Sequence, residues 1–245
     1  ELFDNYKAQR PDVPEDLLTQ LPVAISWVEK MGFKIAIRTG YEADDMVASI
    51  AKDAKEKGFE VRIVSHDKDL YQLIDDANSV YLFDPTKKQI INEAKCIEKY
   101  GVTPKQFIDY QALVGDTADN IPGVKGVGAK TAQTLIEQFG TLENIYENIE
   151  NIDKKRTKEL LIEGKENAFL SKQLVTLKDD CHFISNIDEF SLPLENPILK
   201  IASDLESYDM HRIIERVNRN GLNYKTEVPK KVEDEKIEYI LLNNE

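Results

Sequence analysis

The chain has 245 residues, and a hydrophobic fraction of 41% is enough for the core of one large globular domain or two smaller ones. No apolar run reaches the roughly 20 residues that a membrane-spanning helix needs, and the N-terminus lacks the pattern of a signal peptide, so we expect a soluble, cytoplasmic protein without membrane contact. The net charge of −13 lowers the expectation of nucleic-acid binding, and two cysteines far apart in the sequence indicate neither a disulfide framework nor a zinc site.

The first half of the chain alternates predicted helices and strands. In chain order these are a helix entered at residues 11–14 and ending near residue 32, a strand over 33–38, a helix over 44–57, a strand over 60–65 and a β-hairpin of residues 80–83 and 89–91. We expect Pro22 to kink the first helix or to displace its start. The alternation predicts an α/β fold with a mostly parallel sheet and flanking helices.

The second half of the chain is predicted to be helical. Thr103 is a suitable N-cap for a helix running toward Val114, and a further helix follows a glycine-rich run. Shorter helices are predicted over residues 141–149, 154–162, 165–174 and 207–218, the last one ended by a glycine at position 221. Residues 225–236 resemble a charged linker, and residues 237–242 resemble the first strand of another domain.

Three short acidic clusters stand before the glycine-rich run. They are Glu42/Asp44/Asp45, Asp67/Asp69 and Asp116/Asp119. The first two each follow a predicted strand and therefore meet at the same edge of the sheet. Each cluster alone has an ordinary explanation, since first-turn acids complement a helix dipole and aspartates form turns. Converging carboxylates are also the ligands of hard divalent cations such as Mg²⁺, and the combination favours a metal site.

The glycine-rich run extends from Gly123 to Gly128 and opens a predicted helix. Glycines allow close backbone approach, and helix N-termini offer N–H groups to phosphates. Lys125 and Lys130 are the only charged residues over positions 120–136, so this window is positive within an acidic chain. A nucleotide-binding P-loop is rejected, because it requires Gly-x₄-Gly-Lys-Ser/Thr after a strand. The run indicates sequence-independent contact with a DNA backbone.

Together these motifs resemble the 5′-nuclease domains of bacterial DNA polymerases I, which belong to the 5′-3′ exonuclease and flap endonuclease family. The resemblance covers residues 1–221. Its motifs are Tyr6-Lys7-x-x-Arg10, Glu42-Ala-Asp44-Asp45, Asp67-Lys-Asp69-Leu and Gly115-Asp116-x-x-Asp119-Asn-Ile-Pro-Gly123-Val-Lys-Gly126-Val-Gly128.

The resemblance implies a two-metal nuclease that uses Mg²⁺ or Mn²⁺ and cuts DNA at 5′ flaps and nicks in replication and repair. It assigns Glu42 and Asp44 to one metal and Asp67, Asp69 and Asp119 to a second, with Asp45 and Asp116 as further ligands or outer-shell partners. It implies that Tyr6, Lys7 and Arg10 hold the 5′ single strand, and that Lys7 and Arg10 take part in catalysis. The implied duplex-binding residues, in a helix-three-turn-helix element that also binds K⁺, are Gly123, Lys125, Gly126, Gly128, Lys130 and Thr131.

The resemblance also implies a domain organisation. Residues 1–101 are expected to belong to the α/β nuclease core, 102–221 to the helical DNA-binding lobe, and 222–245 to a linker and the start of a proofreading-like domain in a DNA polymerase. We expect the first strands of the core and their aspartates to precede residue 1, leaving the metal site incomplete, cleavage weak or absent and DNA binding partly retained. A non-catalytic DNA-binding module and a nuclease acting on RNA remain the alternatives.

Overall fold

The computed structural model describes residues 3, 5–181, 187–192 and 196–219. The chain divides into two compact units. Unit 1 comprises residues 1–14 and 36–187, and unit 2 comprises residues 15–35 and 188–245. None of the described helices combines the length and the apolar character needed to cross a membrane.

Unit 1 contains a three-stranded sheet in the order β1-β2-β3. Its strands are β1 (Val61–Val64), β2 (Val80–Asp84) and β3 (Gln89–Ile91). β1 and β2 are parallel, with Ile63 opposite Leu82, whereas β2 and β3 form an antiparallel hairpin. The predicted strand over 60–65 and the predicted hairpin are therefore confirmed.

The predicted strand over residues 33–38 is wrong. In the described part of the chain no backbone hydrogen bonds join this segment to a neighbouring strand, and Ile37 is 71% exposed. A run of β-prone residues becomes a strand only where another strand supplies the hydrogen-bond ladder. The described sheet consequently has one parallel pair rather than several.

Helix α2 (Ala43–Glu56) packs on β1 and begins with a capping box. The Glu42 carboxylate accepts from the backbone N–H of Asp45, and the Asp45 side chain accepts from the N–H of Glu42. Helix α3 (Glu93–Tyr100) was not predicted. Its N-cap Asn92 accepts from the N–H of Lys95, and its one buried side chain gives little periodic signal.

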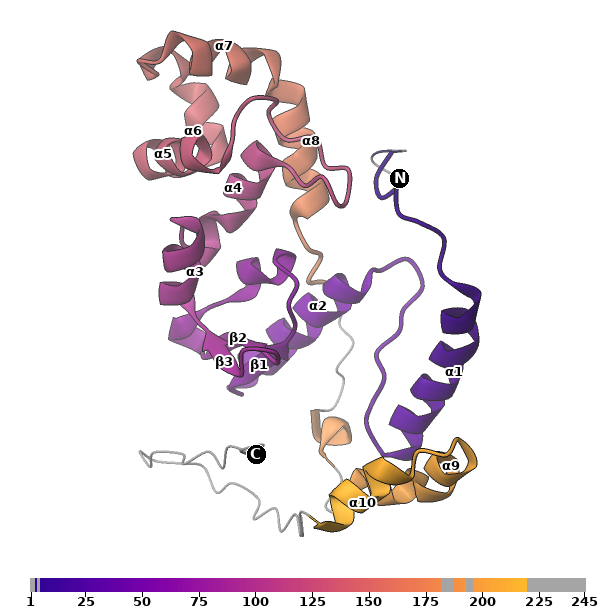
Figure 1. The fold of residues 1–245 in the computed structure, drawn as a ribbon. Coiled ribbons are helices and arrows are strands. Elements are labelled where there is room, and N and C mark those ends of the chain that lie inside the picture. Colours follow the sequence, from indigo (N-terminus) through magenta and orange to yellow (C-terminus); the bar gives the residue numbers. More distant parts are fainter. Residues whose placement is uncertain (1–2, 4, 182–186, 193–195, 220–245) are drawn as a thin grey trace. The chain divides into compact units, whose positions relative to one another are not determined.

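The rest of unit 1 is helical, as predicted. The helices are α4 (Phe107–Val114), α5 (Ala129–Phe139), α6 (Leu142–Glu147), α7 (Lys155–Glu163) and α8 (Lys165–Val175). Figure 1 shows α4 among these helices, and it packs against α5, α6 and α8. Thr103 caps a short 3-10 turn ahead of α4, in a capping box with Gln106. The fully buried Phe107 and Leu113 anchor α4 in the core.

Short 3-10 helices connect these elements. In the described chain they are Asp69–Leu73, Asp76–Asn78, Pro104–Gln106, Ile149–Asn151, Ile187–Phe190 and Pro197–Ile201. The first of them begins at a residue of the second acidic cluster and contacts both α2 and α4. It therefore links the sheet region of unit 1 to its helices.

Unit 2 contains α1 (Glu15–Lys30), α9 (Ala202–Ser207) and α10 (His211–Arg219). α1 continues through Pro22, so the start of the helix is not displaced. The helix predicted over 207–218 begins four residues later, because Asp209 has a positive φ of 56° and separates α9 from α10. The predicted helix end at position 221, the linker over 225–236 and the strand over 237–242 lie outside the described residues.

Candidate metal centre and DNA-binding loop

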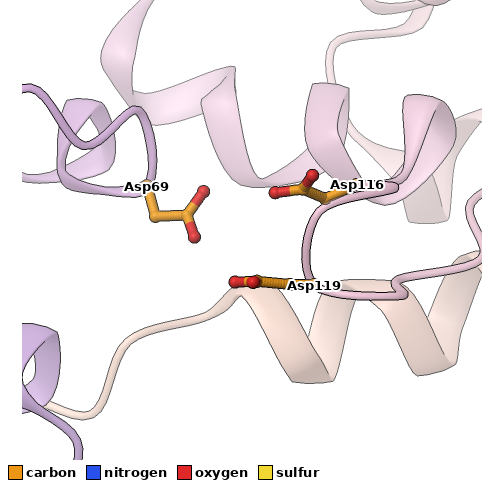
Figure 2. Close-up of side chains that lie close together, drawn as sticks. All are labelled: Asp69, Asp116 and Asp119. Atoms are coloured by element: carbon orange, nitrogen blue, oxygen red, sulfur yellow. The ribbon is translucent and has the colours of Figure 1, made fainter. Parts of the chain in front are cut away.

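Three carboxylates of unit 1 converge on one point. Asp69, Asp116 and Asp119 each offer one oxygen, and these atoms lie within 4.8 Å of one another. Figure 2 shows the Asp69 carboxylate facing the other two. Asp116 and Asp119 are only 8% and 7% exposed. An all-oxygen set at this spacing suits one hard divalent cation, so the second and third acidic clusters meet as a metal site requires.

The loop after α4 fixes the positions of two of these carboxylates. Asp116 and Ile121 exchange two backbone hydrogen bonds, of 2.9 and 2.7 Å, which close the loop. The Asp116 side chain also accepts from the N–H of Ala118 at 2.9 Å. The alternative explanation of an aspartate turn therefore describes the local structure correctly. The same turn directs two carboxylates to one side, so the turn and the metal site are compatible.

Each of the two buried carboxylates has a cationic neighbour. Lys68 Nζ lies 2.9 Å from Asp116 Oδ2, and Arg10 Nη2 lies 2.5 Å from Asp119 Oδ1. Burial lowers the pKa of Lys68, but the contact with Asp116 outweighs it, and the pKa is raised. Lys68 stands between two predicted ligands and was assigned no role from the sequence. Its position in an Asp-Lys-Asp run is the sequence signal that could have identified it.

The first acidic cluster divides into different roles. The Glu42 carboxylate accepts from Lys7 Nζ at 2.6 Å and from the Tyr6 hydroxyl at 3.3 Å. Both Asp45 oxygens accept backbone N–H groups, one from Glu42 at 3.1 Å and one from Lys178 at 2.9 Å. Asp45 thus has the geometry of a capping residue, whereas Glu42 binds Lys7 beside the cavity described below.

Asp44 is a member of the first cluster whose pKa is raised by burial and by the charges of the second cluster. Burial, followed by the negative charges of Asp67 and Asp69, raises its pKa to about 6. Burial is also the largest cause of the raised pKa of Asp69. Asp67 accepts from the N–H of Asp69 at 3.0 Å, so the two ends of the Asp-Lys-Asp run are held together.

A cavity of about 600 Å³ lies beside the first acidic cluster, within unit 1. It is lined by Phe3, Tyr6, Lys7, Gly40, Glu42, Asp44, Asp45, Asp69 and residues 173–178. The wall formed by residues 173–178 was not predicted, because nothing local in the end of α8 shows that it lies against residues 100 positions away. The cavity brings together Glu42, Asp44 and Asp69. It does not include Asp67, Asp116 or Asp119 in its lining.

The glycine-rich run has the predicted local structure. Gly126 has a positive φ of 89°, and Gly128 is the N-cap of α5 without a side chain to cap it. The first N–H groups of a helix have no intrahelical acceptor, and Lys125 and Lys130 are exposed beside them. This end of α5 therefore offers donors and positive charge to an anion.

Gly123 has a packing role. It has a positive φ of 58°, and its N–H donates to Ser171 Oγ at 2.9 Å in the interior. A Cβ at this position would lie 2.5 Å from the backbone nitrogen of Gly115. Because its N–H already has a partner, the expected phosphate contact falls to the part of the loop from Gly126 onward.

Comparison with known families covers most of the chain. Residues 1–101 match the family model described as 5′-3′ exonuclease, N-terminal resolvase-like domain, and residues 102–197 match 5′-3′ exonuclease, C-terminal SAM fold. DNA polymerase I of Helicobacter pylori strain J99 is 43% identical over 213 residues, which are 85% of this chain and 23% of that protein. The 5′-3′ exonuclease of Aquifex aeolicus is 36% identical over 222 residues, which are 89% of this chain and 73% of that protein.

Two solved structures of T5 nucleases are also similar. T5 5′-exonuclease with bound divalent zinc ions matches with a TM-score of 0.63 and 27% identity, over 84% of this chain and 78% of that chain. The T5 D15 flap endonuclease in a pseudo-enzyme-product complex with DNA and metal ions matches with a TM-score of 0.62 and 26% identity, over 87% and 77%. The expected fold, with a nuclease core and a helical lobe, is thereby confirmed.

Proposed function

The chain belongs to the 5′-3′ exonuclease family of metal-dependent nucleases, and from this premise we propose that its site hydrolyses DNA phosphodiesters at 5′ flaps and nicks. One observation carries the proposal: Asp116 and Asp119, which cluster with Asp69, directly precede in the sequence a glycine loop with an uncapped helix N-terminus. Ligands for a cation and donors for a phosphate thus follow each other in one segment of the chain, and phosphodiester hydrolysis needs both.

The donor set fits the metal that we propose. All three clustered ligand atoms are carboxylate oxygens, which Mg²⁺ and Mn²⁺ prefer. We assign Asp69, Asp116 and Asp119 to one ion, with Asp67 supporting Asp69, and Glu42 and Asp44 to a second, with Asp45 fixing their helix end. Bound divalent cations supply an activated water and neutralise the charge that develops on the phosphate.

Two cations of the N-terminal segment contribute to the reaction. Lys7 and Arg10 contact Glu42 and Asp119, so their positive charges stand at the edge of the acidic site. In the DNA complex we assign both cations to phosphates of the 5′ strand, near the scissile bond. Tyr6 lies beside Lys7, with its ring 4.7 Å from the ammonium, and offers a face on which a base can stack.

The glycine loop holds the duplex. Gly126 and Gly128 expose backbone N–H groups, Lys125 and Lys130 add charge, and Thr131 lies in the first turn of α5. Such contacts orient a duplex without reading its sequence. We further propose that loop carbonyls bind K⁺.

The chain spans about a quarter of the length of the polymerase relatives that it matches. That the nuclease is linked to polymerase domains, and that it acts in the bacterial cytoplasm, are therefore part of this proposal.

Cleavage of a 5′-labelled flap DNA in Mg²⁺ or Mn²⁺ tests the function. In an N-terminally extended version, the double variant Asp67→Ala/Asp69→Ala is expected to lose cutting and to keep DNA binding, measured by fluorescence anisotropy. If this variant cuts as well as its extended parent, or if the chain and the extended version both fail to cut, the site is a DNA-binding module. Faster cutting of an RNA flap of equal shape would instead indicate a nuclease that acts on RNA.

A further inference from the structure

Gln111 is a buried glutamine that contacts the acidic site. It lies in α4 and is 3% exposed. Its Nε2 donates to Asp69 Oδ1 at 2.5 Å, across 42 positions of sequence. Its Oε1 is buried and has no hydrogen-bond partner among the described residues.

The three clustered carboxylates are held in different ways. Asp116 has the ammonium of Lys68, and Asp119 has the guanidinium of Arg10. Among the described groups, Gln111 is the one that hydrogen-bonds the Asp69 carboxylate. A neutral amide donor fixes the orientation of a carboxylate and leaves its charge available, whereas a cation competes for that charge with any metal ion.

The energetics of the glutamine favour a role beyond packing. A buried amide oxygen without a partner costs about 1–3 kcal/mol, and an apolar side chain of similar size would avoid this cost. The stabilising interaction that the structure shows for the Gln111 side chain is its bond to Asp69. The amide of Gln111 thus combines an oxygen that lowers stability with a bond to a carboxylate of the proposed metal site.

We propose that Gln111 is a positioning residue, whose amide holds one oxygen of Asp69 and thereby presents the carboxylate to the cluster with Asp116 and Asp119. Figure 2 shows the orientation in question, with the Asp69 carboxylate facing the other two. The inference rests on the proposed function, because it assumes that this cluster binds a divalent cation. Hydrogen bonds that orient metal ligands typically change metal affinity by 10- to 100-fold.

The test replaces Gln111 by methionine, which has a similar shape and no donor. Titration with Mn²⁺ alone, followed by calorimetry or by the EPR signal of the free ion, is expected to show an affinity at least about 10-fold weaker than that of the wild type. The melting temperature without metal is expected to change little, because removal of the unpaired oxygen offsets the loss of the bond to Asp69. A lower melting temperature with unchanged Mn²⁺ affinity would overturn the inference and assign Gln111 a structural role.

Gln133→Met is the matched control. The Gln133 side chain donates to the carbonyl of Tyr100 at 2.6 Å, in unit 1 but away from the carboxylates. Its loss is expected to lower the melting temperature and to leave the Mn²⁺ affinity unchanged. An equal loss of affinity in both variants would show a general effect of removing a glutamine and would contradict the proposed role.

A double-mutant cycle shows whether Gln111 acts through Asp69. In an Asp69→Ala background, Gln111→Met is expected to cause no further loss of Mn²⁺ affinity, and an undiminished additional loss would overturn the inference. The failure of the proposed function has a different signature. If the proposed function fails, Asp116→Asn does not reduce the Mn²⁺ binding of the wild type. If only the inference fails, Asp116→Asn reduces Mn²⁺ binding and Gln111→Met leaves it intact.

Discussion

Arg10 donates two hydrogen bonds to one oxygen of Asp119, across 109 positions of sequence, with its Nη2 at 2.5 Å. The backbone N–H of Lys7 also donates to the carbonyl of Asp119, at 3.0 Å. The N-terminal segment is therefore docked on the loop that presents the clustered carboxylates. The residues expected to hold the 5′ strand of DNA and a proposed metal ligand are positioned together, so a change at one end of this contact reaches the other.

In the N-terminally extended version, Lys7→Ala is expected to reduce flap cleavage by about 100-fold, because a charge that stabilises the reacting phosphate is lost. The free energy of unfolding is expected to change by less than about 1 kcal/mol, since the Lys7 and Glu42 side chains are 23% and 50% exposed. Lys95→Ala is the control, as it breaks a pair of the same 2.6 Å length with Glu98 outside the site. Equal cleavage by the two variants would contradict the assignment of Lys7.

Removal of the loop lysines is expected to weaken DNA binding and its salt dependence. Each phosphate contact contributes about 0.9 to the slope of log affinity against log salt, so Lys125→Ala and Lys130→Ala should each reduce that slope by about one. The measurement is anisotropy with a labelled duplex over a range of KCl concentrations. Lys57→Ala, at the exposed C-cap of α2, is expected to leave the slope unchanged. The same decrease for all three variants would show that only net charge matters.

The pH dependence of stability is expected to follow Asp44. Its folded pKa is about 6 and its ordinary value is 3.8, so between these values the folded state binds the proton more tightly than the unfolded state. Stability therefore rises as pH falls through 6. In EDTA, the wild type is expected to gain stability relative to Asp44→Asn between pH 7.5 and 4, measured by urea unfolding. A difference that stays constant over this range would show that burial and the neighbouring carboxylates do not raise the pKa of Asp44.

Gly123→Ala is expected to destabilise unit 1 by about 3 kcal/mol. The new Cβ would meet the backbone of Gly115 at 2.5 Å, and φ is positive at this position, so overpacking adds to backbone strain. Gly128→Ser is the control, because a Cβ there meets nothing within 4 Å and serine is a good N-cap. If both variants have the same free energy of unfolding, the close approach of the two glycines is unimportant for stability.

Much of the fold was predictable where the signal is local. Helix α2 and the helices after position 102 have apolar residues at helical spacing, and the β-hairpin has a turn between two β-prone runs. The segment over 33–38 has the same strand-like composition as β1 but no neighbouring strand among the described residues, and composition does not reveal pairing. Helix α3 is short and buries one cysteine, so its periodicity is too weak to read.

The site was predictable as a set of motifs but not as a set of contacts. The Asp-Lys-Asp run and the loop after α4 were both identified, and the structure brings Asp69, Asp116 and Asp119 together. The sequence did not indicate that Asp45 accepts from the N–H of Lys178, or that the N–H of Gly123 is taken by Ser171. These contacts join distant segments, and nothing in either segment alone specifies them.

The most direct test is a Mn²⁺ titration of the wild type and of Asp116→Asn/Asp119→Asn, with melting curves to show that both are folded. The account gives at least one Mn²⁺ bound by the wild type and lost, or weakened by 100-fold or more, in the double variant, because two of three clustered carboxylates no longer offer a charged oxygen. Identical binding curves for two folded proteins would contradict it, since the cluster of Asp69, Asp116 and Asp119 would then not be the metal centre.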